Sequence, residues 1–205
     1  MNRDRVILGI DPGLANTGWG IVRQRGSKLT CVAYGCVTTP TEQPLAERLA
    51  KIYEQIGAVI QKYGPSCIGI ETVWFGQNIT AAFATGQARG AALVACAQGG
   101  LDVGEFSPRQ IKLAVVGTGS ADKAQVQYMV KQLLGLDAEP KPDHAADALA
   151  AAICYTTHEG IEARGQNRLE QAESAAAAAG ASNKLEAAIA AAEARDAAAA
   201  KRRAR

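Results

Sequence analysis

The sequence predicts an α/β domain in which a mixed sheet of five strands is flanked by helices. Three β-prone runs follow one another up to Thr39 with short turns between them, which is typical of an antiparallel meander. A helical run and another apolar strand come next, and this order favours parallel pairing with the first strand. The predicted strands are 6–10, 18–22, 29–39, 67–71 and 101–106, and the predicted helices are 45–63, 80–98, 109–116, 120–136 and 143–153.

The first predicted strand, Val6–Ile10, is aliphatic at four of its five positions and ends at Asp11. Pro12-Gly13 then forces a turn, because proline fixes φ and glycine admits positive φ values. Asp11 is therefore expected at the tip of a central strand, facing a cleft where a cation or a phosphate would be bound. The alternative is that its carboxylate only caps the turn.

The predicted strand Cys67–Ile70 ends in Glu71 and repeats this pattern. Helix-spaced apolar residues from Leu45 to Tyr63 precede it, and Gly64-Pro65 ends that helix. Parallel neighbours bring their carboxyl ends together, so Asp11 and Glu71 are expected to face each other. Taken alone, Glu71 would be an exposed strand end.

Two adjacent aromatic residues, Trp74 and Phe75, follow Glu71. Exposed rings beside a carboxylate suit base stacking, whereas the alternative is that one or both pack in the core. In the next predicted helix, Gly86 and Gly90 lie four residues apart, so they share a face that permits close packing.

Two lysines flank a glycine-rich loop at 117–120. Lys112 lies on a short predicted helix with Ser107 as N-cap, and Lys123 opens the following helix. The loop lacks the spacing of a phosphate-binding P-loop. Single lysines are usually solvated, but two around an exposed glycine loop suit contact with a DNA backbone.

The helix predicted from 143 has Asp143 as its expected N-cap. His144 and Asp147 are three residues apart and share a face in its first two turns, where small alanines leave room for ions or a substrate. The alternatives are that His144 is an ordinary surface residue and that Asp147 is a first-turn acid favoured by the helix dipole.

Composition limits the class of protein. The net charge of the 205-residue chain is +2, so any basic surface must be local. The five cysteines show no zinc-ligand spacing, and we expect buried thiols in a reducing cytoplasm. The N-terminus leads directly into the first strand and no run approaches a membrane span, so a cytoplasmic protein without a signal peptide or membrane contact is expected.

Four motifs taken together resemble the RuvC family of Holliday-junction resolvases. They are Gly9-Ile10-Asp11-Pro12-Gly13, Ile70-Glu71 followed by aromatics, Gly86-Gln87-Ala88-Arg89-Gly90, and His144-Ala145-Ala146-Asp147-Ala148-Leu149. Their order and spacing hold over residues 5–157. The resemblance implies an RNase H-like fold, a homodimer, and acidic residues that hold divalent metal.

The resemblance also implies a set of catalytic and metal-binding residues, which we call the acidic site. These are Asp11, Glu71, His144 and Asp147. Mg²⁺, two ions per subunit, is the implied cofactor, with Mn²⁺ able to substitute. His144 stands where many members carry Asp and some carry His, which leaves the preferred metal open. Asp143 comes one position earlier, and its phase on the helix argues that it points elsewhere.

DNA contacts are implied for Trp74, Lys112, Lys123 and Arg89. Trp74 falls at the aromatic that packs on a junction base, and the lysines match basic residues near the cleaved phosphate. The implied activity is a structure-selective endonuclease that nicks two strands of a four-way junction symmetrically, in homologous recombination and DNA repair. The implied partners are junction DNA, a second copy of the chain and the branch-migration RuvAB complex.

Two other functions are weighed against this one. An actin-like or sugar-kinase-like ATPase also begins with a strand and Asp-x-Gly, but residues 1–159 leave no room for its second lobe and second phosphate loop. A junction-binding protein without catalysis would not need the residues of the acidic site to converge. ATP binding tests the first alternative, and metal-dependent nicking of a synthetic junction tests the second.

The composition changes after Glu159. Residues 160–205 are mostly alanine, with too few large apolar residues for a core and a basic end at Lys201–Arg205. We therefore predict a folded domain at 1–159 and a disordered or fluctuating helical tail at 160–205.

Truncation after Glu159 is expected to leave the melting temperature almost unchanged and to lower only salt-sensitive DNA affinity, because the tail adds positive charge and no core. Thermal melts, with DNA titrations at two salt concentrations, compare the full and shortened chains. A large drop in melting temperature would contradict the domain boundary.

Overall fold

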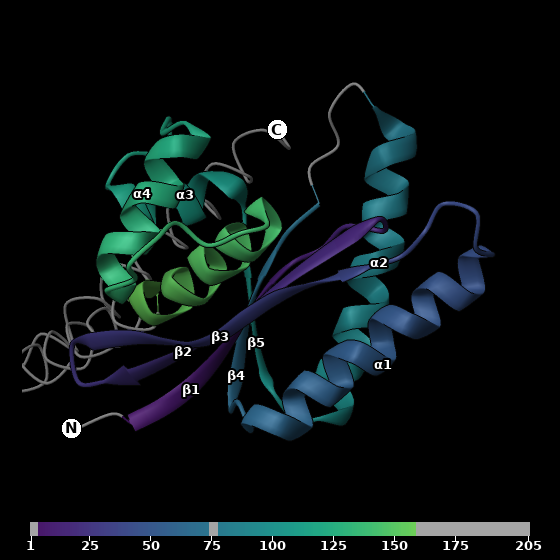
Figure 1. The fold of residues 1–205 in the computed structure, drawn as a ribbon, viewed down its shortest axis with the longest axis horizontal. Coiled ribbons are helices and arrows are strands. Elements are labelled where there is room, and N and C mark those ends of the chain that lie inside the picture. Colours follow the sequence, from purple (N-terminus) through teal and green to yellow (C-terminus); the bar gives the residue numbers. More distant parts are fainter. Residues whose placement is uncertain (1–3, 74–77, 159–205) are drawn as a thin grey trace, which may run out of the picture. The chain divides into compact units, whose positions relative to one another are not determined.

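The computed structural model describes residues 4–73 and 78–158. Within them, five strands form one mixed sheet in the order β3-β2-β1-β4-β5 (Figure 1). β1 pairs antiparallel with β2 and parallel with β4, which confirms both predicted pairings. The strands are β1 (Asp4–Asp11), β2 (Asn16–Arg25), β3 (Lys28–Thr38), β4 (Cys67–Glu71) and β5 (Asp102–Phe106).

Helices cover both faces of the sheet. Figure 1 shows α1 and α2 on one side, and α3, α4 and a further helix at residues 143–158 on the other. We call this further helix the crossing helix. The labelled helices are α1 (Leu45–Tyr63), α2 (Ile79–Gln98), α3 (Pro108–Val116) and α4 (Lys123–Leu134).

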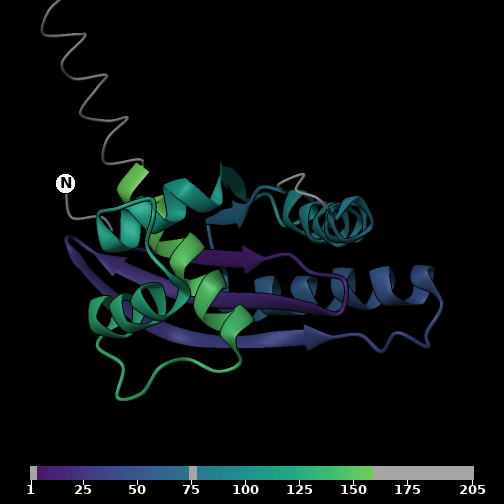
Figure 2. The ribbon, with the colours of Figure 1, turned by 90° about the horizontal axis from the view of Figure 1, so that it is seen from above.

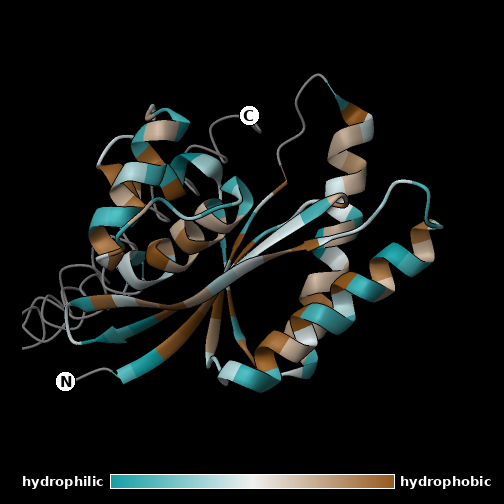
Figure 3. Ribbon diagram, viewed as in Figure 1, coloured by the Kyte–Doolittle hydropathy of each residue, from teal (hydrophilic) through white to brown (hydrophobic). Residues whose placement is uncertain are grey.

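The alternation of side chains along the strands feeds two hydrophobic cores. Ile7 and Cys67 pack with α3, α4 and the crossing helix, whereas Leu8 and Ile68 pack with α1 and α2. β1 is apolar along most of its length (Figure 3), as expected for a strand that is covered on both faces. Asp11 is four residues after Ile7, so it belongs to the face that the crossing helix covers.

The crossing helix lies directly on the sheet because glycines leave room for it. A Cβ atom on Gly18 would stand 1.9 Å from the carbonyl oxygen of His144, and one on Gly9 would stand 1.8 Å from that of Ala148. Each strand meets about one helical turn, since a turn rises about 5.4 Å and strands lie about 4.8 Å apart. Figure 2 shows the helix running across the strands. The contacts from β2 to β5 are Gly18 with His144, Gly9 with Ala148, Gly69 with Ala151, and Gly104 with Tyr155.

Most local signals in the sequence work as predicted, and three do not. Ser107 caps α3 and forms a reciprocal capping box with Gln110. Gly13, however, does not adopt a positive φ; a Cβ there would lie 2.5 Å from the carbonyl oxygen of Asn16, so the turn needs space. The crossing helix begins at residue 143, which places Asp143 in its first turn and not at the N-cap. α4 spans Lys123–Leu134, between its N-cap Asp122 and a left-handed glycine, and not the predicted 120–136.

The cysteines form no disulfide bonds within the residues that the structure describes. All five thiols are free, and burial raises the pKa of Cys96 and Cys154 to about 12, which makes them unreactive. Within residues 4–73 and 78–158, none of the helices has the length and apolar character needed to cross a bilayer.

Gly18→Ala is expected to destabilise the protein by about 1–3 kcal/mol, because its new methyl group would overlap the helix backbone at His144. Thermal unfolding measures the loss. Gly57→Ala is the matched control, since a Cβ there meets nothing within 4 Å and alanine favours the helix. Equal melting temperatures for Gly18→Ala and wild type would contradict the close seating of the crossing helix.

Candidate active site and metal centre

Asp11 and Glu71 end two neighbouring parallel strands. Ile10 pairs with Ile70 in the register of β1 and β4, so the next residue of each strand is an acid. Asp11 comes two residues after Gly9, and Glu71 comes two residues after Gly69. Both glycines lie under the crossing helix, and side chains two residues apart share a face of the sheet, so both acids point toward that helix.

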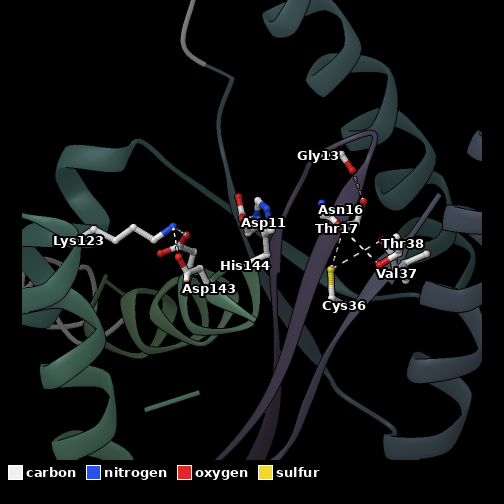
Figure 4. A network of polar contacts seen from close by, with 11 residues as sticks. Asp11, Gly13, Asn16, Thr17, Cys36, Val37, Thr38, Lys123, Asp143 and His144 are labelled. Atoms are coloured by element: carbon white, nitrogen blue, oxygen red, sulfur yellow. Dashed lines mark hydrogen bonds and ion pairs between the residues drawn. The ribbon is translucent and has the colours of Figure 1, made fainter. Parts of the chain in front are cut away.

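The crossing helix brings His144 and Asp147 to Asp11. One potential ligand atom from each of these residues lies within 4.8 Å of the others. His144 Nδ1 is 2.7 Å from Asp11 Oδ2 (Figure 4), and this hydrogen bond is the main reason that the pKa of His144 is raised. Asp11 thus contacts the helix and does not simply cap its own turn.

Glu71 interacts electrostatically with Asp11 and Asp147. Burial, and after it the negative charges of Asp11 and Asp147, raise the pKa of Glu71 to about 7, while the positive charge of Lys112 opposes this rise. Glu71 and Asp147 line a cleft of about 260 Å³, together with Lys112 and Lys123. Glu71 lies outside the tight group formed by Asp11, His144 and Asp147 among the described residues.

The chemistry of these groups fits a divalent cation. Burial also raises the pKa of Asp147, and the charge of Asp11 adds to this shift. The shift shows that ionised Asp147 is disfavoured beside the charge of Asp11, and a bound cation would offset this repulsion. The carboxylate oxygens of the site suit Mg²⁺ or Mn²⁺.

Both predicted lysines lie at this cleft. Lys123 Nζ is 3.2 Å from Asp143 Oδ2 and 3.4 Å from Asp147 Oδ2, so it bridges the first turn of the crossing helix (Figure 4). Lys112 comes from α3 and lines the same cleft. Asp143 faces Lys123 and is not part of the group formed by Asp11, His144 and Asp147.

Arg89, which is also predicted to contact DNA, makes two contacts within the protein. Its Nε donates a hydrogen bond to the carbonyl oxygen of Glu71 at 3.2 Å, and its guanidinium also pairs with Glu105. Its side chain is 18% exposed. Trp74, predicted to stack on a base, lies outside the described residues, as does the predicted tail at 160–205.

The turn after Asp11 is fixed by residues that sequence reasoning missed. Thr17 Oγ1 donates to the carbonyl oxygen of Gly13 at 2.7 Å (Figure 4), and Thr17 is fully buried. Arg48 on α1 donates to Thr39 Oγ1 at 2.9 Å, and the Thr39 hydroxyl donates in turn to the carbonyl oxygen of Leu14. A buried threonine has no distinctive sequence pattern, which is why these contacts were not predicted.

Known proteins resemble the chain over the region that builds the site. The family model of crossover junction endodeoxyribonuclease RuvC matches residues 7–155. RuvC of Treponema denticola is 50% identical over 147 residues, covering 72% of this chain and 83% of that protein. RuvC of Hyphomonas neptunium is 51% identical over 152 residues, covering 74% and 90%.

Solved structures give the same result. RuvC of T. thermophilus in complex with a Holliday junction substrate matches with a TM-score of 0.74 and 34% identity, covering 77% of this chain and 96% of that one. The yeast mitochondrial Holliday junction resolvase Ydc2 matches with a TM-score of 0.58 at 17% identity, which shows a shared fold.

Glu71→Gln is expected to stabilise the metal-free protein at high pH. The folded-state pKa of Glu71 is raised from 4.5 to about 7, so ionising Glu71 costs stability as the pH rises through this range. Glutamine cannot ionise, and the gain should be about 3 kcal/mol, or about 6–12 °C in melting temperature, well above pH 7.

This gain should vanish below about pH 4.5, where Glu71 is protonated in both the folded and the unfolded chain. Thermal melts in EDTA at several pH values measure it. A constant difference between the variant and wild type across pH would contradict the raised pKa.

Proposed function

Because this chain belongs to the RuvC family of crossover junction endodeoxyribonucleases and resolves Holliday junctions, we propose that it cleaves DNA at the acidic site. The observation that carries this proposal is the convergence of Asp11, His144 and Asp147 within 4.8 Å of one another. Asp11 on β1 and His144 on the crossing helix are 133 positions apart in the sequence, so only the fold brings them together.

The proposed cofactor is Mg²⁺, two ions per subunit, with Mn²⁺ able to substitute. Asp11 is hydrogen-bonded to His144, and its charge acts on both Glu71 and Asp147. Asp11 would therefore be shared between the ions, Glu71 would hold one of them, and His144 and Asp147 would hold the other. When bound, divalent ions lower the pKa of water and neutralise charge that grows on phosphate oxygens. Glu71 and His144 must be deprotonated to act as ligands, so metal affinity should increase with pH.

The lysines of the cleft are proposed to hold the scissile phosphate. Lys112 and Lys123 place positive charge on the wall of a cleft whose other members include Glu71 and Asp147. A phosphodiester drawn to the lysines would therefore lie beside the acidic site. Trp74 follows closely on Glu71 in the chain, and we propose that it stacks on a base where the junction opens.

A homodimer is supported by one face of α2. Ile79 and Phe83 are 72% and 66% exposed, and Val94 lies three turns further along the same side. A Cβ placed on Gly86 or Gly90 would meet nothing within 4 Å, so this apolar face is open to the backbone of a second helix. A symmetric dimer would carry two acidic sites and could nick two strands of one four-way junction.

The biological setting is proposed from the family. Paired symmetric nicks leave ends that can be joined, which suits homologous recombination and DNA repair. The branch-migration RuvAB complex is the proposed partner that delivers junctions.

Asp11→Asn tests the function directly. We expect it to abolish nicking of a synthetic four-way junction in Mg²⁺, because it removes the charge that two ions would share. Junction binding should survive or tighten, since a phosphate would no longer meet a bare carboxylate. Cleavage and gel-shift assays on the same preparation separate the two effects, and a near wild-type nicking rate would contradict the proposal.

His144 should set the metal preference. Imidazole suits Mn²⁺ better than Mg²⁺, so nicking should be faster in Mn²⁺ at equal low concentration, and His144→Asp should narrow this gap. Asp143→Asn is the matched control and should have little effect, because Asp143 pairs with Lys123 outside the tight ligand group. If Asp143→Asn stopped cleavage while His144→Ala did not, the ligand assignment would be wrong.

A further inference from the structure

Arg89 joins helix α2 to the end of strand β4. Its Nε donates to the backbone carbonyl oxygen of Glu71 at 3.2 Å, and its Nη2 pairs with the carboxylate of Glu105 on β5. The Arg89 side chain is 18% exposed, compared with 54% for Glu105. Arg89 is therefore largely buried, whereas its partner Glu105 is open to solvent.

The carbonyl that Arg89 contacts lacks its usual partner in the sheet. Thr72 donates its N–H to Phe106 on β5 at 2.9 Å, and consecutive residues of a strand turn their polar groups to opposite edges. The carbonyl of Glu71 therefore faces β1. Ile70 pairs with Ile10, so in a continued parallel register this carbonyl would accept a hydrogen bond from the backbone N–H of residue 12. Residue 12 is proline, which has no N–H to donate.

Arg89 supplies the donor that Pro12 cannot. A backbone carbonyl that is removed from solvent needs a hydrogen-bond donor, and the guanidinium of Arg89 donates a charge-assisted hydrogen bond. The pairing of β1 with β4 ends at Ile70, so this contact replaces the ladder at the residue that carries the acid. Glu105 in turn holds the guanidinium in one orientation.

We propose that Arg89 is a positioning residue that fixes the backbone of Glu71 and so aims its carboxylate at the metal site. The proposal rests on the metal role of Glu71 in the proposed function. It assigns Arg89 to the support of the acidic site and not to a direct contact with DNA. A lysine cannot replace it, because only the planar fork of arginine reaches two acceptors in fixed directions.

The test compares Arg89→Lys with wild type in two measurements. Mn²⁺ binding to the DNA-free protein, measured by isothermal titration calorimetry, should weaken by about tenfold, as is usual when a residue that supports a metal ligand is changed. Junction affinity measured in EDTA should stay the same, because the positive charge is kept. Arg25→Lys is the matched control, since Arg25 pairs with Asp4 on the surface and should change neither value.

Glu105→Gln gives a second, independent reading. If Arg89 positions Glu71, loosening its partner should weaken Mn²⁺ binding in the same direction as Arg89→Lys, with junction affinity unchanged. If Arg89 instead contacts DNA, releasing it should tighten junction binding and leave Mn²⁺ affinity as it was. That result, or wild-type Mn²⁺ affinity in Arg89→Lys, would overturn the proposal.

Glu71→Gln distinguishes a failure of the metal role of Glu71 from a failure of the positioning role of Arg89. Unchanged Mn²⁺ binding in this variant would remove Glu71 from the metal site, and the proposed function would then need revision together with the role of Arg89. Weakened binding in Glu71→Gln with wild-type binding in Arg89→Lys would reject only the positioning role.

Discussion

The acidic site depends on how closely one helix approaches the sheet. The crossing helix contacts β2 and β1 backbone to backbone at Gly18 and Gly9, where a single methyl group would stand less than 2 Å from a carbonyl oxygen. Where the helix crosses β1 and β4, its contacting residues are themselves small, namely Ala148 and Ala151. Any larger side chain on either surface would lift the helix, and His144 would then leave hydrogen-bond distance of Asp11.

This seating also explains why the site can hold groups that repel one another. Burial raises the pKa of Glu71 and of Asp147, and each is further raised by the charge of Asp11. The two hydrophobic cores on either side of the sheet hold the strands and the helix in place despite this repulsion. The resulting site is under electrostatic strain without a cation, which is the condition under which a divalent ion gains most from binding. Two hydrogen bonds also hold the ends of these strands. Arg89 on α2 donates to the carbonyl oxygen of Glu71, and Thr17 on β2 donates to that of Gly13 in the turn after Asp11.

Much of this arrangement could be predicted from local rules. Strand alternation and parallel pairing place Asp11 and Glu71 side by side, and helical spacing puts His144 and Asp147 on one face. The roles of Gly9 and Gly18 were harder to predict, because they are set by a helix far along the chain. Gly13 was expected to adopt a positive φ, whereas the structure shows that a side chain there would collide with Asn16. The contact of Arg89 with a carbonyl oxygen depends on a missing N–H at Pro12, and no spacing in the sequence reports such a pairing. DNA contacts by Trp74, Lys112, Lys123 and Arg89 stay predictions, as does the domain boundary at 159.

The most direct test is a crystal structure of the protein soaked with Mn²⁺, in which anomalous scattering locates the ions without assumptions about ligands. We expect an anomalous peak beside the Asp11 carboxylate, with His144 and Asp147 among the ligands of the ion and Asp143 still paired with Lys123. A peak held by Asp143, or Asp11 without an ion at saturating Mn²⁺, would contradict this expectation.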